Sequence, residues 1–135
     1  MAFTAPASGL PPIHGNYSQL LQVFLNLFQN AIHALDGRPA PRVEVRAQVV
    51  GGEDDARVLV LAVADNGTGI EPALLARIFE PFITTKATGN GPQRGGMGLG
   101  LAIVKRIVEG HRGAITATSE TGQGTTFLIH LPCLR

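Results

Sequence analysis

Several features are scarce in this sequence of 135 residues, and each scarcity narrows the class of protein. The single cysteine, Cys133, cannot form a disulfide within the chain, which fits a reducing cytoplasm. A formal net charge of +1 provides no basic field, so general nucleic-acid binding is not expected. The longest apolar run, residues 58–64, is far too short to span a membrane, so no direct membrane contact is expected.

The length and composition indicate a single domain with one core. The apolar fraction of 44% is ordinary for a globular protein. Residues 1–10 lack the charged start and apolar centre of a signal peptide. We therefore predict a linker, rich in Ala, Ser and Pro, over residues 1–11 and one domain over residues 12–135.

A predicted helix over residues 17–36 carries an unusual polar strip. Its apolar side chains fill an arc of about 200° when residues are placed at about 100° intervals. The remaining strip holds carboxamides and one imidazole, where a solvated helix face usually holds Lys, Glu and Arg: Gln19, Gln22, Asn26, Gln29, Asn30 and His33. Asparagine is unfavourable in mid-helix, so two of them on an otherwise buried helix predict a polar ligand. A buried hydrogen-bond network is the alternative.

A hairpin is predicted after this helix. Residues 42–49 alternate between apolar and polar side chains, which is typical of a half-solvated strand. Residues 57–64 consist of Arg57 and a continuous apolar run, which indicates a strand that is covered on both sides or lies at the centre of a sheet. A short strand before the first helix is expected to include His14.

The second half of the chain alternates helices and strands. In order, we predict a short helix, a polar Gly-rich lid, a helix and two strands, over residues 71–77, 87–97, 101–108, 114–119 and 125–131. A loop as long and polar as the predicted lid is usually functional or disordered. The whole order predicts a mixed α/β fold, with helices on one face of a mostly antiparallel sheet.

The buried strand is followed directly by Asp65-Asn66-Gly67-Thr68-Gly69. A carboxylate at the tip of a central strand is costly unless it has a partner. We therefore predict that ionised Asp65 accepts a hydrogen bond from an amino group of a ligand, while the glycines leave room for a flat ring. An ordinary Asp-Gly turn is the alternative.

Four glycines between Gly95 and Gly100 precede the predicted helix at residues 101–108. Free N–H groups and the positive dipole end at a helix N-terminus favour phosphate. We predict that this stretch contacts the phosphates of a nucleotide; a plain flexible turn is the alternative. Lys86 and Arg94 would be able to swing over the phosphates from the lid.

Five motifs now stand in one order along the chain: Asn26-Leu-Phe-Gln-Asn30-Ala31, Asp65-Asn-Gly67-Thr-Gly69, Phe79-Glu-Pro-Phe82, Gly96-Met-Gly-Leu-Gly-Leu101 and Gly122-Gln-Gly-Thr-Thr-Phe127. This series resembles the N, G1, F, G2 and G3 boxes of the ATP-binding catalytic domain of bacterial sensor histidine kinases. The resemblance covers about residues 12–132. The wider superfamily includes gyrase, Hsp90 and MutL.

The resemblance implies a two-layer α/β sandwich of the Bergerat fold. A mixed, mostly antiparallel sheet would pack on about three helices, and ATP with Mg²⁺ would lie between the helices and a long lid. By the resemblance, Asn30 supplies an oxygen to Mg²⁺, and Asp65 accepts from the adenine amino group near Gly69 and Thr125. The other nucleotide-binding positions that it implies are His33, Gly67, Ile70, Phe82, Lys86, Gly96, Gly98, Leu99, Gly100 and Leu101. Asn26, Asn30 and Lys86 form the expected catalytic set.

The resemblance also implies a reaction and partners. The γ-phosphate of ATP would pass to a histidine on a dimerising, phosphotransfer helical hairpin, and from there to a response regulator. None of the four histidines of this sequence lies in the expected His-acidic motif, so the hairpin is expected on a domain absent from this chain. The family dimerises through that hairpin, which leaves this fragment free to be monomeric, and a cytoplasmic location is expected.

Two alternatives belong to other classes. The first is a nucleotide-switched binding module, or another member of the wider superfamily, that binds ATP without transferring phosphate. The second is a Gly-rich domain without a ligand. ATPase branches of the superfamily carry a Glu where this chain has Asn26. An amide cannot act as a general base, so slow hydrolysis by the isolated chain is expected.

Overall fold

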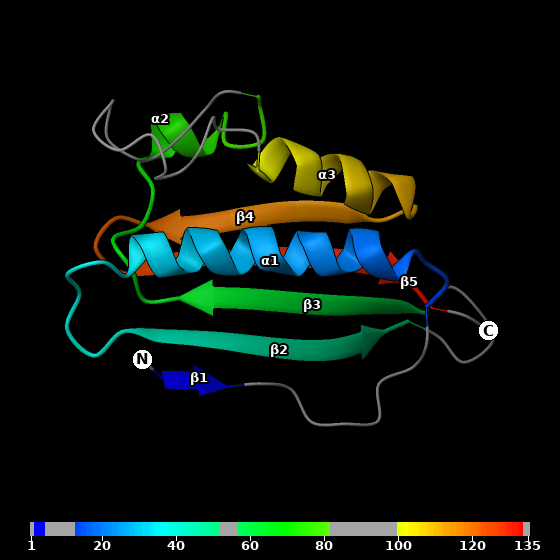
Figure 1. Ribbon diagram of the computed structural model, residues 1–135, viewed down its shortest axis with the longest axis horizontal. Coiled ribbons are helices and arrows are strands. Elements are labelled where there is room, and N and C mark those ends of the chain that lie inside the picture. Colours follow the sequence, from blue (N-terminus) through cyan, green and yellow to red (C-terminus); the bar gives the residue numbers. More distant parts are fainter. Residues whose placement is uncertain (1, 5–12, 52–56, 82–99, 134–135) are drawn as a thin grey trace.

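The computed structural model describes residues 2–4, 13–51, 57–81 and 100–133. These form a five-stranded sheet and three helices (Figure 1). The strands are β1 (Ala2–Thr4), β2 (Arg42–Val50), β3 (Val58–Asp65), β4 (Ala114–Glu120) and β5 (Gly124–Pro132). The helices are α1 (Tyr17–Ala34), α2 (Pro72–Leu75) and α3 (Gly100–Gly110).

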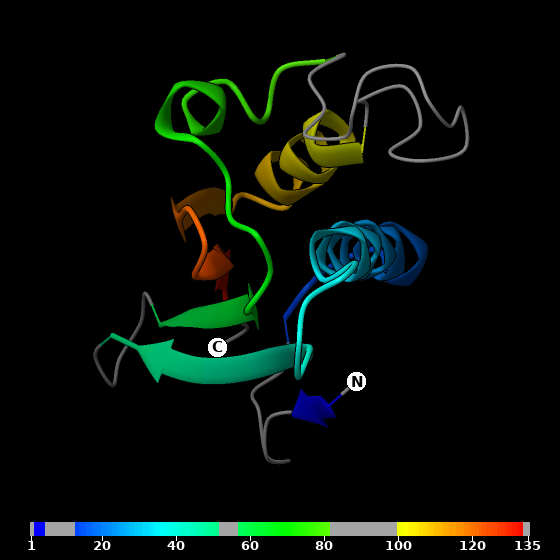
Figure 2. The ribbon, with the colours of Figure 1, turned by 90° about the vertical axis from the view of Figure 1, so that its left-hand side faces the viewer.

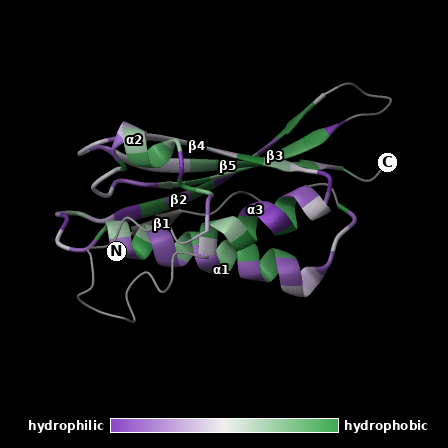
Figure 3. Cartoon of the chain, turned by 90° about the horizontal axis from the view of Figure 1, so that it is seen from above, coloured by the Kyte–Doolittle hydropathy of each residue, from purple (hydrophilic) through white to green (hydrophobic). Residues whose placement is uncertain are grey.

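The sheet has the strand order β1-β2-β3-β5-β4. β1 runs parallel to β2, and the other three pairs are antiparallel. Helices α1 and α3 lie together on one face of the sheet (Figure 3), and α2 lies beside β4 at its edge. The predicted mixed, mostly antiparallel sandwich is confirmed.

Strand β3 occupies the centre of the sheet, with β2 on one side and β5 on the other. Leu59, Leu61 and Val63 are buried toward the helices. Ala62 points to the opposite face and is buried as well. The continuous apolar run is thus explained by a central position between two strands, and not by a second helical layer.

Helices α1 and α3 pack side by side and run antiparallel over the sheet (Figures 1 and 2). Leu27 of α1 and Val104 and Val108 of α3 are fully excluded from solvent. At the edge, Phe79 follows α2 and meets the ring of Phe127 edge-on, with centroids 6.3 Å apart. This contact anchors the chain after α2 to the core.

The expectation that α1 is buried around most of its circumference is wrong. Leu21, Leu25 and Ile32 are about half exposed, at 46%, 52% and 50%. A helix that lies on one sheet and one helix buries only the side toward them, so an apolar arc wider than that side remains in solvent.

The chain before α1 also differs from expectation. His14 lies in an irregular segment, not in a strand. One of the two edge strands is β1, so residues 2–4 of the predicted linker belong to the sheet. A strand of three residues is too short to show a period. The domain boundary at residue 12 stays a prediction.

Within the described residues, no helix combines the length and the hydropathy that crossing a membrane requires.

Candidate functional site

The polar strip on α1 narrows to three side chains in the structure. Asn26, Asn30 and His33 are half-buried, while the glutamines of the strip are exposed. These three positions follow one another at intervals of four and three residues, so they lie on one line along the helix. The strip therefore presents a row of polar side chains beside the core.

Asn26 connects the strip to the beginning of α3. Its side-chain Nδ2 donates to the carbonyl oxygen of Gly100 at 3.3 Å. A carboxylate at residue 26 would instead face this carbonyl oxygen with negative charge. The contact brings together two predicted site residues from far apart in the sequence, and it gives the amide a role that Glu would not fill.

Asn30 lies one turn further along α1. Among the residues that the structure describes, none makes a hydrogen bond to its carboxamide. The same residues contain no cluster of three or more His, Cys, Asp or Glu side chains able to hold a metal ion. A carboxamide oxygen suits a hard cation that keeps waters and phosphate oxygens as its other ligands. The Asn30 carboxamide thus fits Mg²⁺ that is brought with a nucleotide.

Asp65 stands at the end of β3, beside the C-terminus of α1. Its Oδ1 accepts a hydrogen bond from the backbone N–H of Gly67 at 2.8 Å. Gly67 is buried against α1, where an added Cβ would lie 2.5 Å from the carbonyl oxygen of Ala34. The Thr68 N–H donates to the same oxygen at 3.1 Å. This loop is therefore packed directly onto the end of α1.

The other glycines of this region also meet the protein's own backbone. Gly69 has a φ of +78°, and a Cβ there would lie 2.3 Å from the carbonyl oxygen of Glu120. Gly124, with a φ of +128°, would clash with the carbonyl oxygen of Asp65. The sequence assigned Gly67 and Gly69 to making room for a ligand ring. The structure shows that both are required for chain packing around Asp65.

A hydroxyl pair lies beside Asp65. Thr125 pairs with Asp65 across the β3–β5 ladder and is only 4% exposed. Its Oγ1 is 2.9 Å from Ser119 Oγ, which accepts from the Ile70 N–H at 2.7 Å and donates to the Gly124 carbonyl at 3.0 Å. Ser119 has one hydroxyl proton, so Thr125 must donate to Ser119. The predicted residues Asp65, Ile70 and Thr125 are thus held together.

Three residues that hold the loops of this region together were missed in the sequence: Ser119, Asn66 and Arg38. Ser119 joins Ile70 to Thr125, and its inward position in β4 is the signal that was available. Asn66 accepts from the Arg42 N–H and donates to the Ala40 carbonyl at 2.7 and 3.0 Å. Arg38 donates to the Gly122 carbonyl at 2.8 Å. No sequence pattern marks Arg38, because its partners are backbone atoms in two distant loops.

The site predictions divide into three groups. Two groups of predicted residues are in contact, one on each side of Asn30 along α1. The first is Asn26 with Gly100, and the second is Asp65 with Gly67, Gly69, Ile70 and Thr125. His33 lies on the same strip, and Leu101 packs against the core in the first turn of α3. Predicted positions outside the described residues are Phe82, Lys86, Gly96, Gly98 and Leu99, together with the lid residue Arg94.

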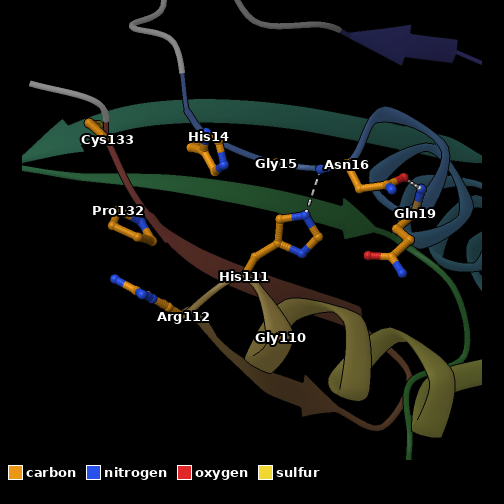
Figure 4. Close-up of a pocket in the computed structure, with 9 residues that line it drawn as sticks. All are labelled: His14, Gly15, Asn16, Gln19, Gly110, His111, Arg112, Pro132 and Cys133. Carbon is orange, nitrogen blue, oxygen red and sulfur yellow. Dashed lines mark hydrogen bonds between the residues drawn. The ribbon is translucent and has the colours of Figure 1, made fainter.

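A pocket of about 720 Å³ lies at the N-terminal end of α1 (Figure 4). Its lining includes His14, Asn16, His111, Arg112 and Cys133. None of the predicted site residues belongs to this pocket. The candidate site is therefore the strip on the C-terminal half of α1, and the pocket is a separate feature.

Comparison with known proteins identifies the family. Residues 15–135 match the family described as histidine kinase-, DNA gyrase B-, and HSP90-like ATPase. The sensory histidine kinase/phosphatase NtrB of Rhizobium meliloti (strain 1021) is 40% identical over 132 residues, covering 91% of this chain and 32% of that protein. The sensor histidine kinase ZraS of Salmonella typhimurium is 40% identical over 134 residues, covering 99% and 26%. The chain thus spans about a quarter to a third of these relatives.

Solved structures agree with the sequence comparison. The mycobacterial sensor histidine kinase MprB superposes with a TM-score of 0.77 at 31% identity, covering 98% of this chain and 83% of that one. Full-length ShkA in complex with AMPPNP gives a TM-score of 0.73 at 32% identity, covering 99% and 26%. This chain belongs to the family of histidine kinase-, DNA gyrase B- and HSP90-like ATPases, as an ATP-binding catalytic domain of the sensor histidine kinase type.

Proposed function

We propose that the domain binds Mg–ATP along the polar strip of α1 and transfers the γ-phosphoryl group to a histidine on a separate domain. The observation that supports this most strongly is the pair of contact groups that bracket Asn30. The beginning of α3 touches α1 at Asn26, and the Asp65 loop touches it at Ala34. At about 1.5 Å per residue, these points lie roughly 12 Å apart along the helix.

Adenine belongs at the Asp65 end of this strip. Asp65 stands at the end of the central strand β3, and its Oδ1 accepts from the Gly67 N–H in the loop packed onto the end of α1. An amino group on the base can donate to the same side chain beside the Ser119–Thr125 pair. Guanine places an acceptor where adenine has this donor, so such a site rejects GTP.

The phosphates belong at the Gly100 end. α3 begins there, and the free N–H groups of its first turn and the helix dipole favour anions. The Asn30 oxygen would hold Mg²⁺, which supplies positive charge to the phosphate oxygens when bound. Lys86, Phe82, Gly96, Gly98 and Leu99 complete the site as predictions.

Phosphoryl transfer depends mainly on positioning and charge neutralisation by the protein. The nucleophile would be an imidazole nitrogen of the partner histidine, and the products would be ADP and phosphohistidine. We place that histidine on a dimerising helical hairpin, with a response regulator as the next acceptor. Because ATP is the substrate, we place the domain in the cytoplasm.

The direct test is to mix the isolated domain with Mg–ATP labelled at the γ-phosphate and a histidine-bearing helical hairpin from a full-length relative. Label on the histidine, which is lost after His→Ala substitution in the hairpin, supports the kinase. Tight binding of ATP without transfer to any hairpin would support the binding module. The absence of ATP binding would refute both functions.

Hydrolysis provides an independent prediction. Because the residue 26 amide cannot accept a proton from water as a general base, we expect the isolated domain to turn ATP over far more slowly than it phosphorylates its hairpin. Phosphate release in the absence of the hairpin measures this rate. Rapid steady-state hydrolysis would contradict the assignment of a protein histidine as the required nucleophile.

A further inference from the structure

His111, which directly follows α3, links this helix to the N-terminus of α1. Its Nε2 lies 2.9 Å from the backbone nitrogen of Asn16, and its Nδ1 lies 2.8 Å from the carbonyl oxygen of Ile107 (Figure 4). A backbone N–H can only donate, so Nε2 must be the acceptor. Nδ1 then carries the proton and donates to Ile107. The ring is thus neutral, with one tautomer fixed by two partners.

Gly15, the residue before Asn16, lies directly against the imidazole ring of His111. A Cβ on Gly15 would lie 2.7 Å from His111 Cδ2 and 2.9 Å from Nε2. Only a residue without a side chain lets the backbone approach the imidazole this closely. Asn16 also caps α1, because its Oδ1 accepts from the Gln19 N–H at 2.9 Å. The imidazole therefore holds the first turn of α1 at a defined position.

The same two helices are joined by a hydrogen bond at a second place, from Asn26 to Gly100. Asn16, the N-cap of α1, lies ten residues before Asn26, and His111, which follows α3, lies eleven residues after Gly100. At about 1.5 Å per residue, these spans are roughly 15 and 17 Å. Apolar packing between them is non-directional. The two hydrogen bonds are directional, so together they set the axial register of α1 against α3.

We propose that His111 is a positioning residue for nucleotide phosphates: by fixing that register, it sets how Asn30 on α1 faces the beginning of α3. This inference rests on the proposed nucleotide site. His111 itself lies at the opposite end of the helix pair, and its hydrogen bonds involve none of the described residues of that site. Its effect would reach the phosphates through α1 and α3 as rigid bodies.

Two substitutions at residue 111 test the two hydrogen bonds of the imidazole one at a time. The amide of Gln at residue 111 can place an oxygen near the position of Nε2, which keeps an acceptor for the Asn16 N–H. The shorter amide of Asn can reach only the position of Nδ1, which keeps the bond to Ile107 and loses Asn16. We expect His111→Asn to weaken Mg–ATP binding about fivefold, and His111→Gln to stay within about twofold of wild type. Adenosine, which carries no phosphate, should bind all three proteins alike.

Calorimetry with Mg–ATP and with adenosine tests this, with thermal unfolding of each variant as the control for folding. The proposal would be overturned if His111→Asn bound Mg–ATP as tightly as wild type does. It would also be overturned if both variants lost the same amount of Mg–ATP affinity. Equal loss of adenosine and Mg–ATP binding would also overturn it, since that indicates a general defect. Should wild type bind no ATP, the proposed function fails instead.

The register can be tested without nucleotide. In spectra of the ¹⁵N-labelled protein, His111→Asn should shift the signals of the Asn26 side-chain amide and the Gly100 backbone amide, and His111→Gln should leave them near wild type. Unchanged signals in His111→Asn would overturn the coupling even if ATP binding were never measured.

Discussion

Each end of α1 is held by a close glycine contact, but the polar side chains beside the two contacts differ in their hydrogen bonding. At each end a glycine backbone lies against a neighbouring element so closely that a Cβ would clash, Gly15 on His111 and Gly67 on Ala34. At the N-terminal end, both ring nitrogens of His111 are used within the chain. Near the C-terminal end, the half-buried Asn30 carboxamide makes no hydrogen bond among the residues that the structure describes.

This difference shows how an enclosed polar group can be assigned to structure or to a ligand. The pocket of about 720 Å³ lies at the N-terminal end, yet its central imidazole is already satisfied. The C-terminal end offers the Asn30 carboxamide, the Asp65 carboxylate and the beginning of α3. Among the described residues, the Asn30 carboxamide, and not the pocket around His111, therefore marks the candidate site.

The largest expected effect concerns the glycine contact at the C-terminal end. Gly67→Ala would force a methyl group into the Ala34 carbonyl, so we expect the free energy of unfolding to fall by about 2 kcal/mol. Gly110→Ala is the matched control: a Cβ there meets nothing within 4 Å, and Ala favours the helix by about 0.5 kcal/mol. Chemical denaturation measures both. Equal stabilities for the two variants would contradict the close packing at Gly67.

The next largest expected effect is on ATP affinity and concerns the Asp65 carboxylate. Asp65→Asn keeps an oxygen for the Gly67 N–H but removes the charge, so we expect ATP binding to weaken by at least about 1.5 kcal/mol. Titration calorimetry with ATP gives this number, and thermal unfolding shows whether the fold is retained. An unchanged affinity would remove Asp65 from the adenine site.

The third prediction concerns the carboxamide. Asn30→Ala removes the proposed metal ligand, so the Mg²⁺-dependent part of ATP affinity should fall by about 1 kcal/mol, while the preference for ATP over GTP is kept. Asn30→Asp is the matched variant, because it retains an oxygen ligand for the cation. Loss of the ATP preference in Asn30→Ala would assign residue 30 to the base and not to the metal.

The smallest effect lies at the N-terminal end, beside His111. Arg112 follows it with a φ of +64°, a left-handed conformation that suits glycine better. We expect Arg112→Gly to raise the free energy of unfolding by about 0.5 kcal/mol, since relief of strain exceeds the added unfolded-state entropy. ATP affinity should not change. Arg112→Ala keeps the strain and should bring no gain, so equal stabilisation by both variants would contradict this explanation.

The sequence predicted well what depends on repeating patterns. The α1 assignment came from periodicity over many residues, β3 came from a continuous apolar run, and the family came from five motifs in order. Two kinds of feature escaped prediction. β1 has only three residues, which is too few for a period. The Arg38 and His111 contacts join residues to backbone atoms far away in the chain, and no local pattern records such partners.

The exposure of α1 illustrates the same limit. Its apolar arc was visible in the sequence, but the side on which the sheet and α3 pack is decided by the fold. Half of Leu25 therefore lies in solvent although its pattern indicated burial. In the same way, Gly67 and Gly69 were recognised as required residues, while the backbone atoms that require them became visible only in the structure.

The central claim is that a nucleotide lies along α1 between Asp65 and Gly100. Titration of the ¹⁵N-labelled domain with Mg–AMPPNP, followed by NMR, tests this most directly. We predict the largest shifts at the Asn30 side-chain amide and the Gly67 and Gly100 backbone amides, with Gly15 unchanged. Shifts centred on Gly15 and the pocket around His111, with the Asn30 amide unmoved, would contradict the account.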